Sequence, residues 1–371
     1  MLPIGQRERG DGVPDPRDIA ARINSWPKNG PQGPLTLEIY PTLRCNLACS
    51  FCDTTDRHRP PVDELTLERH LELLNEASAL GVERVFVLGG GEPLAAKDKI
   101  QQIMARIKEL KMEGILTTNG VLMNRQIRNQ LIETGWDEVH VSIDAPTAEI
   151  HDSLRGQDGA FNRTIKNICR LRGERKLAGA THPRVALHFV LTNKNWRTLP
   201  DMVRLGASLG AFRIDFDSLI AYTPDQLTLQ LSAEEREMVP KIAREAIEVA
   251  EQLGLQTTLA NFLDEANLRR GDHDVTIGTA PATTSASPFA QAPCLKAWHY
   301  IVVQADGKIS PCCVLAGEGE SLREQPLKDL WIGSDYLNNI RSSMLKGQPT
   351  DRCIECSANI LAHEADIRHH L

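Results

Sequence analysis

The chain has 371 residues and a formal net charge of −7, with no lysine- and arginine-rich run that could follow a phosphate backbone, so nucleic acid is not an expected partner. It shows no apolar signal segment at its N-terminus and no stretch approaching the ~18 apolar residues of a membrane span. We therefore expect a cytoplasmic protein that does not cross a membrane.

From about Leu35 to Leu253, short β-rich runs alternate with amphipathic stretches. The predicted strands are Leu35–Tyr40, Arg84–Leu88, Gly114–Thr118, Glu138–Ile143, Arg184–Leu191 and Phe212–Phe216. The predicted helices are Leu67–Leu80, Asp98–Leu110, Asn124–Thr134, Asn162–Arg172, Leu199–Leu209 and Ala233–Leu253, the last with a charged, solvent-facing side. Repeated βα units predict an α/β fold with a parallel sheet, either an open barrel or doubly wound. In both, the chemistry lies at the carboxyl ends of the strands.

After the last predicted helix the sequence changes in character. Residues 278–293 are rich in Ala, Thr, Ser and Pro without a period, which predicts a linker or surface loop. We divide the chain into an N-terminal extension (1–34), an α/β unit (35–255), a linker (256–293) and a small cysteine-rich domain (294–371). In that domain Tyr300–Gln304 and Lys308–Ser310 predict a hairpin, and so small a core would gain from a metal cluster.

Nine cysteines call for a specific explanation, because structural disulfides are rare in the cytoplasm and spaced cysteines there are typical of metal sites. Most of them fall into three groups: Cys45/Cys49/Cys52, Cys294/Cys312 and Cys353/Cys356. Cys169 shares a helical pattern with Ile165 and Ile168, so we predict a buried core thiol. The terminal His363, His369 and His370 are predicted to form a solvated tail.

The spacing Cys45-x3-Cys49-x2-Cys52 directly follows the first predicted strand. Three thiolates can ligate three irons of a cubane and leave the fourth iron open to an external ligand. A zinc site with His58 as fourth ligand is the alternative. The segment TLRCNLACSFCDTT resembles the signature of radical S-adenosylmethionine (SAM) enzymes, and the resemblance extends over roughly Leu35 to Phe216.

This resemblance implies a partial (β/α)6 barrel, a [4Fe–4S] cluster, and reductive cleavage of SAM to a 5′-deoxyadenosyl radical. It also implies the residues that bind SAM, which are Phe51, Gly90, Gly91, Glu92, Asn119, Ser142, Asp144 and Arg155. Phe51 would pack beside the adenine, the Gly-Gly-Glu run would hold the amino group, and Ser142 and Arg155 would hold the carboxylate and ribose. Taken singly, these motifs also fit tight turns and helix caps.

The spacing Cys294-x12-Gly307-x4-Cys312, followed by Cys353-x2-Cys356, resembles the SPASM/twitch extension of one branch of this family. The resemblance implies a four-thiolate auxiliary [4Fe–4S] cluster, in the shorter twitch form. A zinc ribbon is the alternative from spacing alone. Neighbouring strand residues point to opposite faces, so one of Cys312 and its neighbour Cys313 should be a ligand, and the glycine spacing selects Cys312.

Members of this branch modify small molecules or ribosomal peptides. They include aminocyclitol dehydrogenases and peptide maturases. The short N-terminal extension has too few residues for a peptide-recognition domain, which favours a small-molecule substrate such as a sugar, aminocyclitol or nucleotide. We expect oxidation assisted by the auxiliary cluster, with a flavodoxin or ferredoxin-type electron donor. Dehydration, decarboxylation, epimerisation and peptide maturation stay open, as does a non-catalytic iron–sulfur or zinc protein. No catalytic acid or base is assigned.

Overall fold

The computed structural model describes residues 15–52, 62–221, 223–264, 292–355 and 365–371, together with the single positions 268, 287 and 289. Cys356, His58 and His363 therefore lie outside the described residues, as do most residues of the expected linker. None of the helices in the described ranges combines the length and the apolar content of a membrane span.

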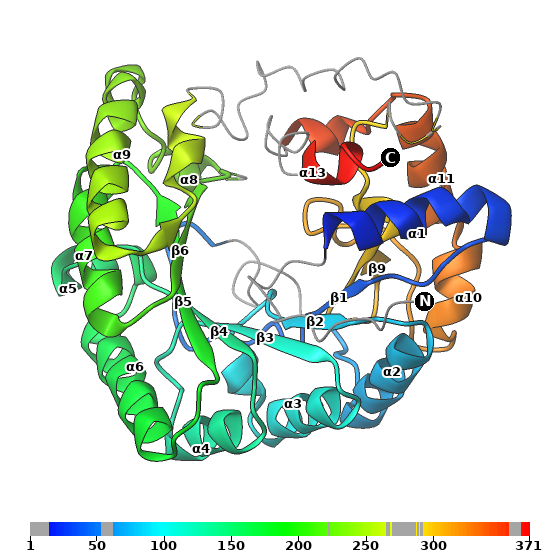
Figure 1. Ribbon diagram of the computed structural model, residues 1–371, viewed down its shortest axis with the longest axis horizontal. Coiled ribbons are helices and arrows are strands. Elements are labelled where there is room, and N and C mark those ends of the chain that lie inside the picture. The colour runs from blue at the N-terminus through cyan, green and yellow to red at the C-terminus, as the bar shows by residue number, and fades with distance from the viewer. Residues whose placement is uncertain are drawn as a thin grey trace, which may run out of the picture.

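One nine-stranded sheet organises the molecule, in the order β7-β6-β5-β4-β3-β2-β1-β8-β9. Its strands are β1 (Thr36–Ile39), β2 (Arg84–Val87), β3 (Glu113–Thr118), β4 (Glu138–Ser142), β5 (Arg184–Leu191), β6 (Arg213–Ser218), β7 (Gln256–Thr257), β8 (Tyr300–Val303) and β9 (Ile309–Ser310). All neighbouring strands pair in parallel except β8 and β9. The sheet curves into an open arc with helices on its outer side (Figure 1), so the partial barrel implied by the resemblance is confirmed.

The helices that follow the strands largely match those that the sequence predicts. They are α2 (Leu67–Ala79), α3 (Asp98–Glu109), α4 (Arg125–Glu133), α5 (Ala148–Arg155), α6 (Ala160–Leu177), α7 (Leu199–Leu209), α8 (Pro224–Leu227) and α9 (Ala233–Leu253). The sequence analysis missed α5 and α8. It also ended α6 too early, because the charged last turns of α6 bury few apolar residues.

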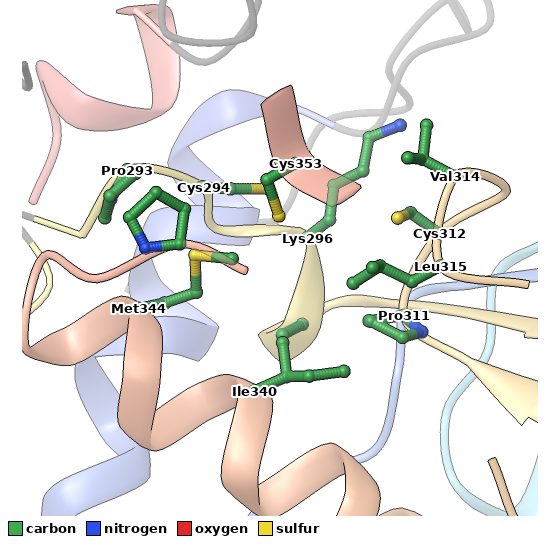
Figure 2. Close-up of a pocket in the computed structure, with 12 residues that line it drawn as sticks. Pro293, Cys294, Lys296, Pro311, Cys312, Val314, Leu315, Ile340, Met344 and Cys353 are labelled. Carbon is green, nitrogen blue, oxygen red and sulfur yellow. The ribbon is translucent and has the colours of Figure 1, made fainter. Parts of the chain in front are cut away.

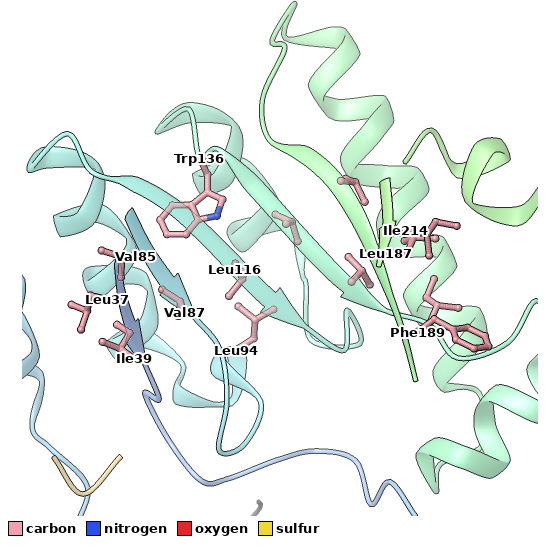
Figure 3. Packing of buried hydrophobic residues seen from close by; sticks show 14 of the residues in the cluster. Leu37, Ile39, Val85, Val87, Leu94, Leu116, Trp136, Leu187, Phe189 and Ile214 are labelled. Carbon is pink, nitrogen blue, oxygen red and sulfur yellow. The ribbon is translucent and has the colours of Figure 1, made fainter. Parts of the chain in front are cut away.

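The main core lies between the sheet and these helices. Val85, Val87, Leu116 and Leu187 are fully enclosed there, and Figure 3 shows them with their neighbours along the strands. Since side chains alternate across a strand, the intervening residues face the concave side of the arc. That concave side is where the polar residues of β4, β5 and β6 gather.

A second core joins the two ends of the chain. Ile19 and Ile23 of α1 (Pro16–Asn29) pack in one cluster with Leu295, Trp298 and other residues of the C-terminal region. That region also contains α10 (Leu327–Gly333), α11 (Asp335–Leu345) and α13 (Ala365–Arg368). The residues expected to be an N-terminal extension therefore include a helix that covers the cysteine-rich region.

Cys169 corrects one prediction. The structure places it on the exposed side of α6, whereas its neighbour Ile168 is fully buried. Successive helical residues differ in direction by about 100°, so Cys169 points away from the face that Ile168 buries. His369 and His370 are exposed, as predicted for a solvated tail.

Candidate functional site

The loop that carries Cys45, Cys49 and Cys52 follows β1 and crosses the carboxyl edge of the sheet. The three cysteines are half-buried and form no disulfide. The loop is fixed to the end of α5, because the backbone N–H of Ser50 donates to the carbonyl of Leu154 at 2.9 Å. The predicted cluster ligands therefore sit on a loop with a defined backbone position.

Two glycines allow neighbouring segments to approach this loop closely. A Cβ on Gly91 would lie 2.1 Å from the carbonyl oxygen of Arg44, just before the first cysteine. A Cβ on Gly156 would lie 2.2 Å from the carbonyl oxygen of Ala48, and Gly156 has φ +66°. The glycines thus have a packing role toward the cysteine loop, in addition to the contact with SAM that the resemblance implies for Gly91 and its neighbour Gly90.

Arg155 connects the cysteine loop to the end of β4. Its Nε donates to Asp144 Oδ2 at 2.5 Å, and its Nη1 lies 3.8 Å from Cys49 Sγ. The guanidinium also lies over the ring of Phe51, 5.2 Å from the centroid. Burial disfavours the charge, but Asp144 and Cys49 outweigh it and raise the pKa of Arg155 above its ordinary value. Arg155 is therefore a permanent cation beside the predicted cluster.

Asp144 is fully buried, and its second oxygen accepts the backbone N–H of Val190 at 3.0 Å. Its contacts thus orient Arg155 and tie β4 to β5. Ser142, at the end of β4, is half-buried. The predicted SAM-binding role of both residues stays a prediction.

Glu92 is enclosed, and its carboxylate accepts three hydrogen bonds from the protein. The donors are the Thr118 hydroxyl at 2.6 Å, the Asn119 backbone N–H at 2.8 Å and the Leu94 backbone N–H at 3.1 Å. The Asn119 side chain in turn donates to Asn46, inside the cysteine loop, at 3.0 Å. Glu92 and Asn119 thus join the ends of β2 and β3 to the cysteine loop.

The donor set at this loop fits a [4Fe–4S] cluster with an open iron. Burial raises the pKa of the Cys49 thiol to about 11, so without a metal this thiol keeps its proton. Iron binding replaces thiol protons, and the adjacent Arg155 cation offsets the negative charge of the thiolates. Cys45, Cys49 and Cys52 would hold the cluster, which supplies the electron that cleaves SAM.

A second group of cysteines lines one cavity in the C-terminal region. Cys294, Cys312 and Cys353 come from separate segments, and Figure 2 shows their side chains around the same cavity. Cys313 is exposed and does not line it, in agreement with the glycine spacing that selects Cys312. These three thiols fit an auxiliary iron–sulfur cluster, and Cys356, the fourth predicted ligand, lies outside the described residues.

Lys296 provides the positive charge for this second site. Burial disfavours its ammonium, yet the neighbouring cysteines and Glu38 outweigh burial and raise the pKa of Lys296 above its ordinary value. A cation held among cysteines stabilises them as thiolates, the form that binds metal.

The sequence analysis did not identify the polar residues on the concave face of β4, β5 and β6. His140, His188 and Asp215 gather there, one from each strand. The signal was available, because polar residues recur at every second position, as in Glu138-x-His140-x-Ser142 and Arg213-x-Asp215-x-Asp217.

Two family models match the segments that contain the two groups of cysteines. The model of the radical SAM superfamily matches residues 39–206, and that of the SPASM iron–sulfur cluster-binding domain matches residues 294–357. An AdoMet-dependent heme synthase of Methanosarcina barkeri (strain Fusaro / DSM 804) is 26% identical over 308 residues, covering 83% of this chain and 85% of that protein. A PqqA peptide cyclase of Granulibacter bethesdensis is 26% identical over 349 residues, covering 90% and 86%.

Solved structures show the same fold. Streptococcus suis SuiB bound to S-adenosylmethionine is similar with a TM-score of 0.68 and 19% identity, covering 87% of this chain and 71% of that one. The structure of anSMEcpe with bound AdoMet has a TM-score of 0.60 and 17% identity, covering 88% and 87%. The cofactors of radical SAM enzymes with a SPASM domain are SAM, a [4Fe–4S] cluster and auxiliary iron–sulfur clusters. The chain therefore belongs to the radical SAM enzymes with a C-terminal SPASM domain.

Proposed function

We propose that this enzyme oxidises a polar small molecule bound on the concave face of the sheet. When bound, SAM and the first cluster supply a 5′-deoxyadenosyl radical that removes one hydrogen atom from the substrate. Loss of a proton and a second electron would complete the oxidation, and an auxiliary cluster held by Cys294, Cys312 and Cys353 would supply the acceptor for that electron. The product is two hydrogens poorer than the substrate.

The observation that carries this proposal is the pairing of β1 with β8. Cys45 follows the carboxyl end of β1, whereas Cys294 precedes β8 and Cys312 follows β9. Because β8 is parallel to β1 and antiparallel to β9, the two predicted cluster sites lie toward opposite ends of the β1–β8 pair. A substrate on the concave face between these ends could reach both.

The chain's own residues have two tasks in this proposal. Arg155, fixed by Asp144, would orient the SAM carboxylate beside the cysteine loop, since its fork matches two oxygens. The charged side chains on the concave face of β4, β5 and β6 would bind hydroxyl, amine or carboxylate groups of the substrate. This polar lining supports a hydrophilic substrate over an apolar one.

A deuterium-transfer experiment tests the proposal. Candidate polar alcohols carrying deuterium on the carbinol carbon are incubated with reconstituted protein, SAM and dithionite. We expect deuterium in 5′-deoxyadenosine and a product with the mass of the ketone. Deuterium transfer followed by loss of water or carbon dioxide would contradict oxidation and support a dehydratase or decarboxylase.

Peptide modification is the second candidate function, and the comparisons give it specific support. A PqqA peptide cyclase is similar over 90% of this chain. The structure of SuiB bound to precursor peptide SuiA is similar over 91% of it, with a TM-score of 0.66. If a short peptide encoded beside this gene changed in mass with SAM and dithionite, whereas the deuterated alcohols gave no transfer, the peptide would be the substrate.

A further inference from the structure

Two imidazoles and a carboxylate meet on the concave face of β4, β5 and β6, on strands that carry none of the predicted cysteine ligands. His140, His188 and Asp215 each offer one ligand atom, and these atoms lie within 4.8 Å of one another. The two imidazole rings stack with their centroids 6.0 Å apart, and His188 Nε2 is 3.9 Å from Asp215 Oδ2. Strand register brings them together, because His188 pairs with Asp215 across β5 and β6.

A buried carboxylate orients the first imidazole. His140 Nε2 lies 2.9 Å from Glu138 Oε2, and Arg184 Nη2 lies 2.5 Å from the other oxygen of Glu138. Glu138 is 1% exposed, and its two oxygens contact His140 and Arg184 respectively, so this carboxylate is held in one place beside the first ring. A carboxylate that accepts Nε2–H leaves Nδ1 of the neutral ring with its lone pair, which is the arrangement typical of metal-bound histidines.

The charges around the cluster favour a cation. The carboxylates are Glu138, Asp215 and Asp217, and the guanidiniums are Arg184 and Arg213. The three carboxylates outnumber the two guanidiniums in this group. A divalent ion would reverse that balance and occupy the space between the two rings and Asp215.

We propose that His140, His188 and Asp215 bind one divalent transition-metal ion. Two imidazoles and one carboxylate suit Mn²⁺, Fe²⁺, Co²⁺ or Zn²⁺. Three protein ligands leave coordination positions open toward the concave side, where an oxygen or nitrogen donor of a bound molecule could coordinate. The distances between the donor atoms must shorten by about 1 Å for each atom to form a metal bond of roughly 2.1 Å. Rotation of the half-exposed His188 side chain allows this.

Asp215 must also loosen one contact. Its carboxylate lies 2.9 Å from Arg213 Nε on the same strand, so the ion competes with a guanidinium for this ligand. The same face is where the proposed function places the substrate, but metal binding can be measured without a substrate, so the two proposals can fail separately.

Manganese binding to the protein reconstituted with its iron–sulfur clusters tests the proposal, because its cysteines are then occupied by iron and Mn²⁺ prefers oxygen and nitrogen ligands. Free Mn²⁺ is followed by electron paramagnetic resonance during titration. We expect one bound Mn²⁺ per chain, with affinity at least about tenfold weaker in His188→Ala and in Asp215→Asn, and ~10–100-fold weaker in Glu138→Gln. His182→Ala, at an exposed histidine next to β5, is the matched control and should bind as the wild type does.

Two results would overturn the proposal. One is wild-type protein that binds no Mn²⁺. The other is binding that persists unchanged in both His188→Ala and Asp215→Asn, which would locate the ion elsewhere. Iron content and thermal unfolding verify that each variant is folded. If His188→Ala fails to fold, Asp215→Asn decides, since Asp215 lies at the half-buried surface of the concave face.

Discussion

Replacing Gly156 by alanine should disturb the cysteine loop far more than the same change at Gly159, three residues away. Both glycines have positive φ, +66° and +76°, so each alanine costs about 1–2 kcal/mol of backbone strain. Only at Gly156 would the new Cβ also meet backbone, 2.2 Å from the carbonyl oxygen of Ala48, whereas at Gly159 its nearest neighbour is 3.7 Å away on Arg163. Overpacking of this kind costs about 1–3 kcal/mol more and pushes the loop that carries Cys49.

The assay is iron content after anaerobic reconstitution, combined with urea unfolding of each variant. We expect Gly159→Ala to keep the iron content of the wild type and to lose about 1–2 kcal/mol of stability. Gly156→Ala should lose up to about half of its iron, because the displaced loop no longer holds its cluster. Equal iron content in the two variants would refute the claim that Gly156 exists to admit the loop backbone.

Further predictions concern Arg155, His299 and Trp331. Arg155→Lys keeps the charge, but a lysine cannot contact Asp144 and Cys49 together. The rate of 5′-deoxyadenosine formation should therefore fall by about tenfold or more, and an unchanged rate would contradict the role of the guanidinium. Burial, assisted by the charge of Lys296, lowers the pKa of His299 to about 3, so its protonation favours the unfolded state and stability should decline as the pH falls from about 6.5 toward 3. His299→Phe should flatten this decline in urea titrations at several pH values, and an unchanged slope would contradict it. Trp331→Ala should cost about 3–5 kcal/mol and expose the C-terminal region to limited proteolysis, because the fully buried ring packs 4.4 Å from the Arg341 guanidinium; wild-type resistance would count against this packing.

Much of the sheet could be predicted because its strands are short apolar runs that alternate with amphipathic helices. Arg184–Leu191 and Leu199–Leu209 were predicted with the observed bounds. The cysteine-rich hairpin was also predicted, but its place beside β1 was not. That contact joins residues more than 260 positions apart, and no local pattern records which edge of a sheet a distant hairpin will extend.

For the candidate sites, too, the local features could be predicted from the sequence and the long-range contacts could not. The cysteine spacing identified the residues that the structure gathers, since ligand spacing is a local property. The anchoring of Arg155 by Asp144 and the gathering of His140 with His188 and Asp215 depend on strand register. Register is fixed by tertiary packing, so the sequence alone indicated only which side chains are polar and on which face of a strand they lie.

We expect the chain to hold two separate iron–sulfur clusters with separate tasks. Iron content and 5′-deoxyadenosine, measured together in wild-type protein and in the double variant Cys294→Ala/Cys312→Ala, distinguish two clusters from one. We predict about eight irons per wild-type chain, and about four in the variant, which should still cleave SAM because Cys45, Cys49 and Cys52 are intact. About four irons in the wild type, or loss of SAM cleavage in a folded variant, would contradict the account.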